Sequence, residues 1–261
     1  MNIPTRKGKS IWRLIPILMG IAALTVFVST LKTPPMHVSA HSGNIFSTAC
    51  GVAAIDGNVN PAEWSSASTQ TFQMVSPGGA PPFTATLYVM NSGNDLYLGI
   101  AINDDEFSTY GEFLPAGDGF RIDFDNDHSG ALFALHDDVL GIFAGAPQFE
   151  DSYIVGNPVS SSSAPDVNGG GTSDGAGAAS RVGDLNHFEL KHPLCSGDSL
   201  DYCLHPSDTI GFRLEYLDAQ GDGSFGSSQF FPGQEDTSEA DIVISPCSLP
   251  DFLVYLPLLM K

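Results

Sequence analysis

Alternating polar and apolar side chains mark residues 84–130 as a run of β-strands. Residues 84–90 (TATLYVM) and 96–102 (LYLGIAI) each alternate as a strand with one buried face should. The segment between them is rich in Asn, Ser and Gly, so we expect a β-hairpin with a loop of about five residues. A third strand is predicted over 118–125 (DGFRIDFD), where Phe120, Ile122 and Phe124 share one face. The third strand ends in a cluster of acids.

The rest of the chain extends this pattern into one all-β domain. After the N-terminal segment no stretch has a sustained helical stripe of apolar residues, so helices should be few and short. We predict a single antiparallel β-sandwich over 41–250, with jelly-roll or immunoglobulin-like layering. Residues 155–184 differ in composition, with a run of serines at 160–163 and of glycines at 169–171. Because so few apolar side chains are available there, we expect a mobile insertion between strands.

The first forty residues have the composition of a secretory signal. Basic residues precede an apolar run over 14–28, and Val38-Ser39-Ala40 provides small residues for cleavage after Ala40. The alternative is an uncleaved anchor, because the run can be extended to Leu31, about 18 residues and the lower limit for crossing a bilayer. We therefore predict a secreted or cell-surface protein that touches a membrane only through this segment, if it is retained. The apolar tail 251–261 is too short to cross and is predicted to dock as a strand.

Charge excludes several partners. Five of the ten Lys and Arg residues lie in the signal segment and none of the thirty acids does, so the remainder carries a formal net charge of −25. Such a surface repels phosphate backbones, which makes nucleic acid an unsuitable partner. It repels anionic membranes and anionic polysaccharides in the same way.

The four cysteines predict two disulfides. An even number of cysteines in an exported chain favours pairing, and no Cys-x-x-Cys is present to suggest zinc. Cys195 and Cys203 flank a short loop and should pair locally. Cys50 and Cys247 would then join the first and last parts of the domain.

Several short motifs resemble one family of sandwich domains. They are the IDG…EW opening over 55–64, the strand LYLGIAINDDEF over 96–107, DGFRIDFDNDHSG over 118–130, HFELKHPL over 187–194, and the strand and turn over 208–218. Together they resemble the family 9 carbohydrate-binding modules and the wider DOMON-like superfamily. The resemblance implies one antiparallel β-sandwich, bound calcium in some members, sugar binding in some and haem binding in others.

Sugar binding needs flat aromatic faces on which pyranose rings stack. Sugar-binding members of the resembling family use exposed tryptophans, but Trp12 lies in the signal segment and Trp64 in the opening motif, where we expect core packing. The aromatic residues Tyr110 and Phe113 are the predicted ligand-binding residues. Other aromatic side chains that could substitute are Tyr153, Phe225, Phe230 and Phe231.

The acids at the end of the third strand predict a calcium site. Asp123, Asp125 and Asp127 alternate where the strand turns, and calcium takes six to eight oxygen ligands from irregular loops. The pattern is not an EF-hand, because His128 stands where that loop requires Gly. The alternative is solvated acids that only repel one another. The candidate ligands are Asp123, Asp125, Asp127, Asp104, Asp105, Asp137 and Asp138.

The sequence therefore predicts a non-catalytic domain that binds a glycan or a cell-surface polymer, with calcium as a structural ion. No Gly-x-Ser-x-Gly, His-Glu-x-x-His or phosphate-binding loop is present, and no pair of acids is placed for hydrolysis. One alternative is a surface protein whose sandwich serves structure or assembly. A further alternative is a haem-carrying electron-transfer domain, with axial ligands drawn from Met74, Met90, His128, His136, His187 and His192.

Overall fold

A computed structural model describes residues 42–112, 116–156, 162–235 and 237–247. The predicted signal segment 1–40 and the tail 251–261 lie outside these ranges. No helix among the described residues is both long and apolar enough to span a bilayer.

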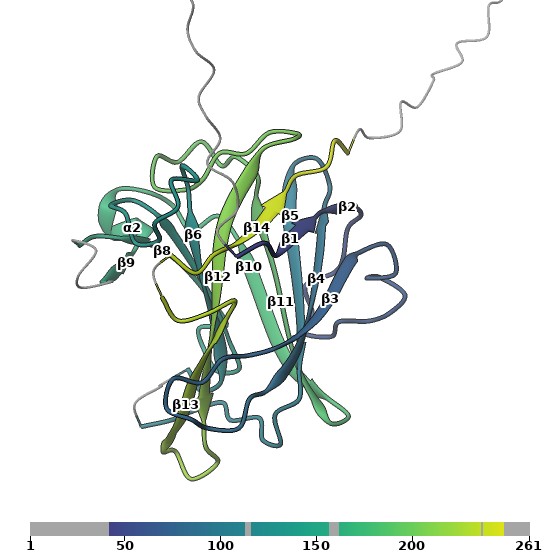
Figure 1. The fold of residues 1–261 in the computed structure, drawn as a ribbon, viewed down its shortest axis with the longest axis vertical. Helices are drawn as coiled ribbons and strands as arrows, with labels where there is room; N and C mark the ends of the chain where they lie inside the picture. Colours follow the sequence, from purple (N-terminus) through teal and green to yellow (C-terminus); the bar gives the residue numbers. More distant parts are fainter. Residues whose placement is uncertain (1–41, 113–115, 157–161, 236, 248–261) are drawn as a thin grey trace, which may run out of the picture. The chain divides into compact units, whose positions relative to one another are not determined.

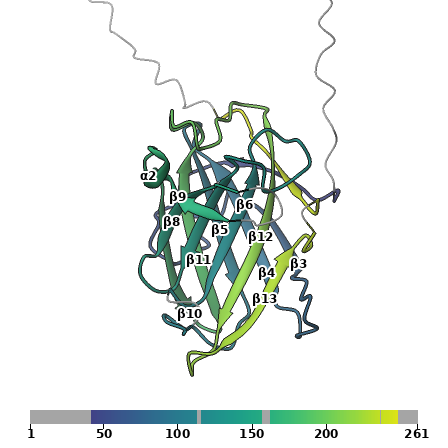
Figure 2. The same cartoon turned by 90° about the vertical axis from the view of Figure 1, so that its left-hand side faces the viewer.

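The larger of two β-sheets has eight strands (Figures 1 and 2). Seven follow the order β1-β14-β12-β6-β7-β8-β9. The eighth, β13, pairs with Leu214–Ala219 of β12, whereas β14 pairs with Thr209–Phe212 of the same strand. Their bounds are β1 Ile45–Ser47, β6 Gly119–Asp125, β7 Asp138–Phe143, β8 Phe149–Ile154, β9 Ser163–Pro165, β12 Thr209–Ala219, β13 Phe225–Phe231 and β14 Ala240–Val243.

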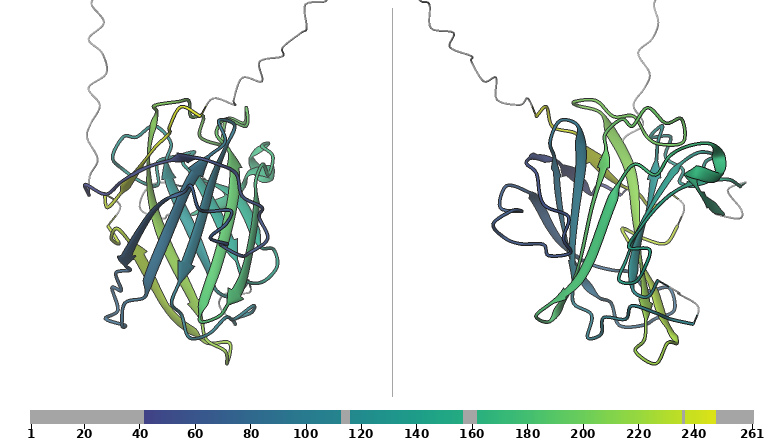
Figure 3. Two further views of the ribbon diagram at one scale, coloured as in Figure 1. Left: turned by 90° about the vertical axis from the view of Figure 1, so that its right-hand side faces the viewer. Right: turned by 180° about the vertical axis from the view of Figure 1, so that it is seen from behind.

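The smaller sheet has six strands and is seen face on in the left panel of Figure 3. Its order is β10-β11-β5-β4-β2, with β3 also paired to β4. Their bounds are β2 Ala49–Cys50, β3 Ser68–Gln73, β4 Thr84–Asn91, β5 Asp95–Ile102, β10 Ala176–Val182 and β11 Leu185–Pro193. The one described helix, α2 (Asp166–Gly169), follows β9 directly.

The hydrophobic core lies between the sheets, as the alternation predicts. Phe120, Ile122 and Phe124 on β6 are fully buried there, and Leu87 on β4 and Ile100 on β5 pair directly in the predicted hairpin. The sequence therefore predicts correctly an all-β sandwich. It does not predict that β1 and β2 pair parallel with β14 and β4, so both sheets are mixed rather than purely antiparallel.

The segment predicted as an insertion carries more regular structure than its composition indicates. Its described part includes β9, α2 and β10, and β10 pairs with β11 along seven residues. Small residues suit this position because a large neighbour fills the space: a Cβ on Gly177 would lie 3.2 Å from the Phe149 side chain. Low apolar content here reflects close packing against Phe149.

Both predicted disulfides are confirmed. Cys50 at the end of β2 bonds to Cys247, just after β14, with a Cα–Cα distance of 5.4 Å. Cys195 bonds to Cys203 and closes a short loop after β11. The first bridge therefore joins the two ends of the described domain.

Candidate functional site: an open face of the larger sheet

The outer face of the smaller sheet is covered by the segment that contains the IDG…EW motif. The indole of Trp64 lies over Gly99, where an added Cβ would come within 3.1 Å of three ring atoms. Its Nε1 donates to Glu189 Oε1 at 2.7 Å, and Glu189 Oε2 accepts the backbone N–H groups of Asp56, Gly57 and Asn58 at 2.8–3.1 Å. Trp64 is core, as predicted, and the part of this face around Gly99 and Glu189 is covered.

The outer face of the larger sheet is covered by Phe133 around Arg213 and Val139, but it is partly exposed farther along the strands. There the register sets two rows of side chains side by side. The first row crosses three strands as Phe143, Gly119 and Leu217. The row beside it crosses four strands, and its members are Glu150, Gly141, Arg121 and Glu215. Because alternate residues of a strand share a face, all of these side chains point away from the core. An apolar row therefore lies against a charged one.

Two glycines allow the Phe143 ring to lie flat on the sheet. A Cβ at Gly119 would lie 2.3 Å from Phe143 Cδ1, and a Cβ at Gly141 would lie 2.6 Å from its Cε2. The ring thus covers both glycine positions with one face. Glycine inside a strand often marks this kind of close approach. The ring is half-buried, and a stacking platform requires one of its faces to be accessible.

A groove of about 300 Å³ lies beside this ring. It is lined by Phe143 and Leu217, by the exposed carboxylate residue Glu150, and by small residues of the loops at 116–117 and 146–147. Arg121 stands in the neighbouring row, 21% exposed, with its Nε 2.7 Å from Asp123 Oδ1. Ring face, carboxylate and guanidinium are the groups that contact the faces and hydroxyls of a neutral sugar.

In the described part of the chain, the aromatic residues predicted from sequence are not among those that line this groove. Tyr110 is exposed and is not part of the groove lining, and Phe113 lies outside the described residues. Phe230 is buried with its ring 5.3 Å from the Arg213 guanidinium, and Phe231 is buried against Phe72. Sequence reasoning missed Phe143, although paired glycines on neighbouring strands were a usable signal.

A second depression of about 520 Å³ lies around Pro81, Phe83 and Gln229. Its central amide is already engaged: Gln229 accepts the Phe83 N–H at 2.9 Å and donates to the Pro81 carbonyl at 2.9 Å. Phe83 is half-buried and makes a T-shaped contact with Tyr216. This depression is the weaker candidate for a sugar.

The seven predicted calcium ligands do not converge on one point. Asp123 is buried between Arg121 and Arg213, Asp104 accepts the Tyr216 hydroxyl, and Asp105 and Asp127 are exposed. The remaining three lie near one end of the larger sheet. Asp125 accepts Gly130 N–H, Asp137 accepts Asn126 and Ala134 N–H, and Asp138 points into the interior.

Two predicted ligands belong to buried groups able to hold a cation: Asp104, with Asp118 and Asp218, and Asp138, whose larger cluster also contains a histidine. The other members of the Asp138 cluster come from outside the predicted set: His192 on β11, Asp151 on β8, Asp166 at the start of α2, and Asp201 in the Cys195–Cys203 loop. No sequence signal linked them, because Asp166 lies in the Gly- and Ser-rich stretch and Asp201 in a disulfide loop. Only the tertiary fold brings them together.

The two methionines considered as haem ligands fill different hydrophobic clusters. Met74 belongs to the main core, and Met90 packs with Trp64 beneath the IDG…EW segment. His187 accepts the Val59 N–H through Nδ1.

We expect the metal-free protein to lose stability as pH rises from about 4 to 8. Burial raises the pKa of Asp118 and Asp137 to about 7, of Asp218 to about 6 and of Glu239 to about 8. The folded state therefore holds protons that the unfolded chain releases near pH 4. Its stability is full below that pH and is lost as pH rises through the folded-state values.

The measurement is urea denaturation in EDTA at pH 4.5, 6 and 8 at constant ionic strength. The free energy of unfolding should fall by on the order of a few kcal/mol across this range. A value at pH 8 equal to or above that at pH 4.5 would contradict the raised pKa values.

No family model matches the chain, and no curated protein matches it in sequence. Solved structures do match in fold. A family 9 carbohydrate-binding module (CBM9) from Caldicellulosiruptor kristjanssonii, in complex with cellotriose, gives a TM-score of 0.54 at 13% identity, covering 78% of this chain and 95% of that one. The fold is CBM9-like.

Two further structures give the same result. The CBM9 module from the same organism in complex with glucose has a TM-score of 0.53 at 13% identity, covering 78% of this chain and 97% of that one. A Bacteroides uniformis protein to which carbohydrate binding has been attributed has a TM-score of 0.52 at 10% identity, covering 78% and 100%. The CBM9-like fold predicted from the sequence motifs is therefore confirmed.

Proposed function

We propose that this protein is an exported, non-catalytic domain that binds a neutral glycan on the outer face of its larger sheet. The observation that carries the proposal is the Phe143 ring, which lies against Gly119 and Gly141, is half-buried and lines the groove. We take its face on the groove side as the one that receives a sugar. A pyranose ring would stack on that face, with Leu217 extending the apolar contact. The neighbouring charged row would receive the hydroxyls, with Glu150 and Glu215 accepting and Arg121 donating.

Three facts support a glycan over other ligands. The CBM9-like neighbours were crystallised with cellotriose and glucose. The chain's large negative charge disfavours anionic polymers and leaves neutral sugars as suitable partners. The groove combines an aromatic side chain with one carboxylate, Glu150, beside a row that also holds Arg121 and Glu215.

The test is isothermal calorimetry of the purified protein with glucose and cellotriose, preceded by a glycan array to find other neutral sugars. Phe143→Ala should weaken binding about two- to tenfold, because one stacked ring contributes about 0.5–1.5 kcal/mol. Tyr110→Ala is the matched control: it removes an exposed aromatic residue outside the groove and should leave affinity unchanged.

Glu150→Gln separates hydrogen bonding from stacking, with Asp184→Asn, an exposed acid in the β10–β11 turn, as its control. Glu150→Gln should weaken binding several-fold and Asp184→Asn should not. A silent array, or equal loss in the Phe143 and Tyr110 variants, would contradict the proposal and favour the structural or assembly role. Calcium as a structural ion remains a prediction that thermal unfolding in calcium tests.

A further inference from the structure

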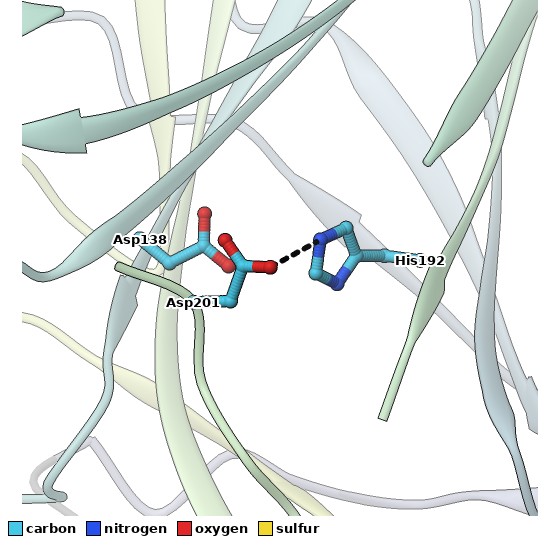
Figure 4. A group of neighbouring side chains, drawn as sticks. All are labelled: Asp138, His192 and Asp201. Atoms are coloured by element: carbon cyan, nitrogen blue, oxygen red, sulfur yellow. Dashed lines mark ion pairs between the residues drawn. The ribbon is translucent and has the colours of Figure 1, made fainter. Parts of the chain in front are cut away.

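Five side chains that bind cations in other proteins meet between the two sheets at one end of the domain. Ligand atoms of Asp138, His192 and Asp201 all lie within 4.8 Å of one another, and so do those of Asp151, Asp166 and Asp201. Figure 4 shows the first three pointing at a common centre. All five residues are at least nine-tenths buried, with exposures of 0–7%. They come from β7, β8, α2, β11 and the Cys195–Cys203 loop.

The histidine is oriented to offer a lone pair to this centre. His192 Nδ1 lies 3.0 Å from the Pro193 carbonyl oxygen, an acceptor, so this nitrogen carries a proton. Nε2 has no hydrogen-bond partner and faces Asp151 Oδ2 and Asp201 Oδ2 at 3.7 Å each. A hydrogen bond needs a shorter distance than 3.7 Å. A neutral Nε2 would turn its lone pair toward two carboxylates, which repels unless a cation lies between them.

The carboxyl groups of this cluster also have few hydrogen-bond donors and little countercharge. Among the described residues Asp138 has no side-chain donor, only the backbone N–H of Tyr202, and the Tyr202 hydroxyl beside it is unpartnered. Within the described part of the chain, His192 is the one basic side chain within 4 Å of these acids. Several buried carboxylates without countercharge cost several kcal/mol each.

We propose that Asp138, Asp151, Asp166, Asp201 and His192 bind one divalent cation. Four carboxylates form an oxygen-rich set that suits Ca²⁺ or Mn²⁺, and the imidazole is a donor that Mn²⁺ uses more readily than Ca²⁺. The ion would link β11 of the smaller sheet to β7 and β8 of the larger one and fix α2 and the disulfide loop. This site is separate from the groove: on β8, Asp151 points inward where Glu150 points outward.

The first test is metal content and thermal unfolding of the purified full chain. Emission spectrometry should find about one Ca²⁺ or Mn²⁺ per chain, removable by EDTA. Adding the bound metal back at a hundred times its Kd should raise the Tm by about 5–10 °C. Absence of metal, together with no Tm shift in Ca²⁺, Mn²⁺ or Zn²⁺, would overturn the proposal.

Single substitutions test whether these residues bind the ion. Asp138→Asn and Asp201→Asn remove charge with little change of shape, so each should abolish the metal-induced shift. Each should also raise the Tm of the metal-free protein, because it relieves repulsion between buried acids. Asp104→Asn is the control: this buried acid accepts the Tyr216 hydroxyl, and the variant should keep the full shift. A shift that persists in both cluster variants, or that Asp104→Asn also abolishes, would overturn the assignment.

His192→Gln distinguishes the two ions. If the bound ion is Ca²⁺, the carboxylates suffice and the Kd should change less than tenfold. If it is Mn²⁺, loss of the imidazole should weaken binding at least tenfold. An unchanged shift for every cation in Asp138→Asn combined with His192→Gln would contradict binding by this cluster.

Discussion

Glu189→Ala is expected to lower the free energy of unfolding by about 3–5 kcal/mol. One carboxylate accepts four donors: the Trp64 indole N–H and the backbone N–H groups of Asp56, Gly57 and Asn58. Three of these donors belong to one turn, so the side chain holds the whole IDG…EW segment on the smaller sheet. Alanine would leave all four without their acceptor.

Urea denaturation monitored by Trp64 fluorescence measures this effect. Glu150→Ala is the control, because Glu150 is an exposed acid whose loss should change stability by less than about 0.5 kcal/mol. Glu189→Gln should be intermediate, since its amide keeps one acceptor oxygen and turns N–H donors toward the remaining donors. A loss below about 1 kcal/mol in Glu189→Ala would show that water replaces the carboxylate and that the motif does not depend on it.

Removing the Cys50–Cys247 disulfide is expected to cost about 5 kcal/mol, the largest effect of any single bond in the domain. The bridge spans 197 residues, so its loss frees nearly the whole described chain in the unfolded state. The Cys195–Cys203 bridge spans eight residues, and the same chain-entropy relation gives about 2.5 kcal/mol.

The two losses of stability are compared in two double variants, Cys50→Ser with Cys247→Ser and Cys195→Ser with Cys203→Ser. Each is unfolded in urea under non-reducing conditions. The short bridge also anchors the loop that carries Asp201, so its removal should weaken cation binding while removal of the long bridge should not. Equal stability losses in the two variants would show that loop length does not govern the effect.

Local patterns were sufficient to predict most of the fold. Alternation over 84–125 predicted the hairpin and the strand that follows it, because the period of two directly reflects one buried face. The cysteine pairs followed from their number and spacing. The parallel pairing of β1 and β2 was not predictable in this way, because short edge strands take their direction from distant neighbours.

The candidate sites depend on contacts between residues far apart in sequence. The acids at the end of β6 and Asp138 at the start of β7 suggested one shared ion. In the structure Asp123 lies on the outer face of the sheet, whereas Asp138 points inward. The partners of Asp138 lie up to 63 residues away, and two of them, Asp166 and Asp201, lie in segments whose composition indicated only loops. Phe143 was overlooked because its ring placement depends on glycines of two strands, a relation that only the register reveals.

The most direct test of the glycan proposal is a crystal structure of the protein with an oligosaccharide that the array identifies. The account predicts a pyranose ring stacked on the groove-side face of Phe143, with hydroxyls bonded to Glu150 and Arg121. A sugar bound at Tyr110, or in the depression around Phe83 and Gln229, would contradict it.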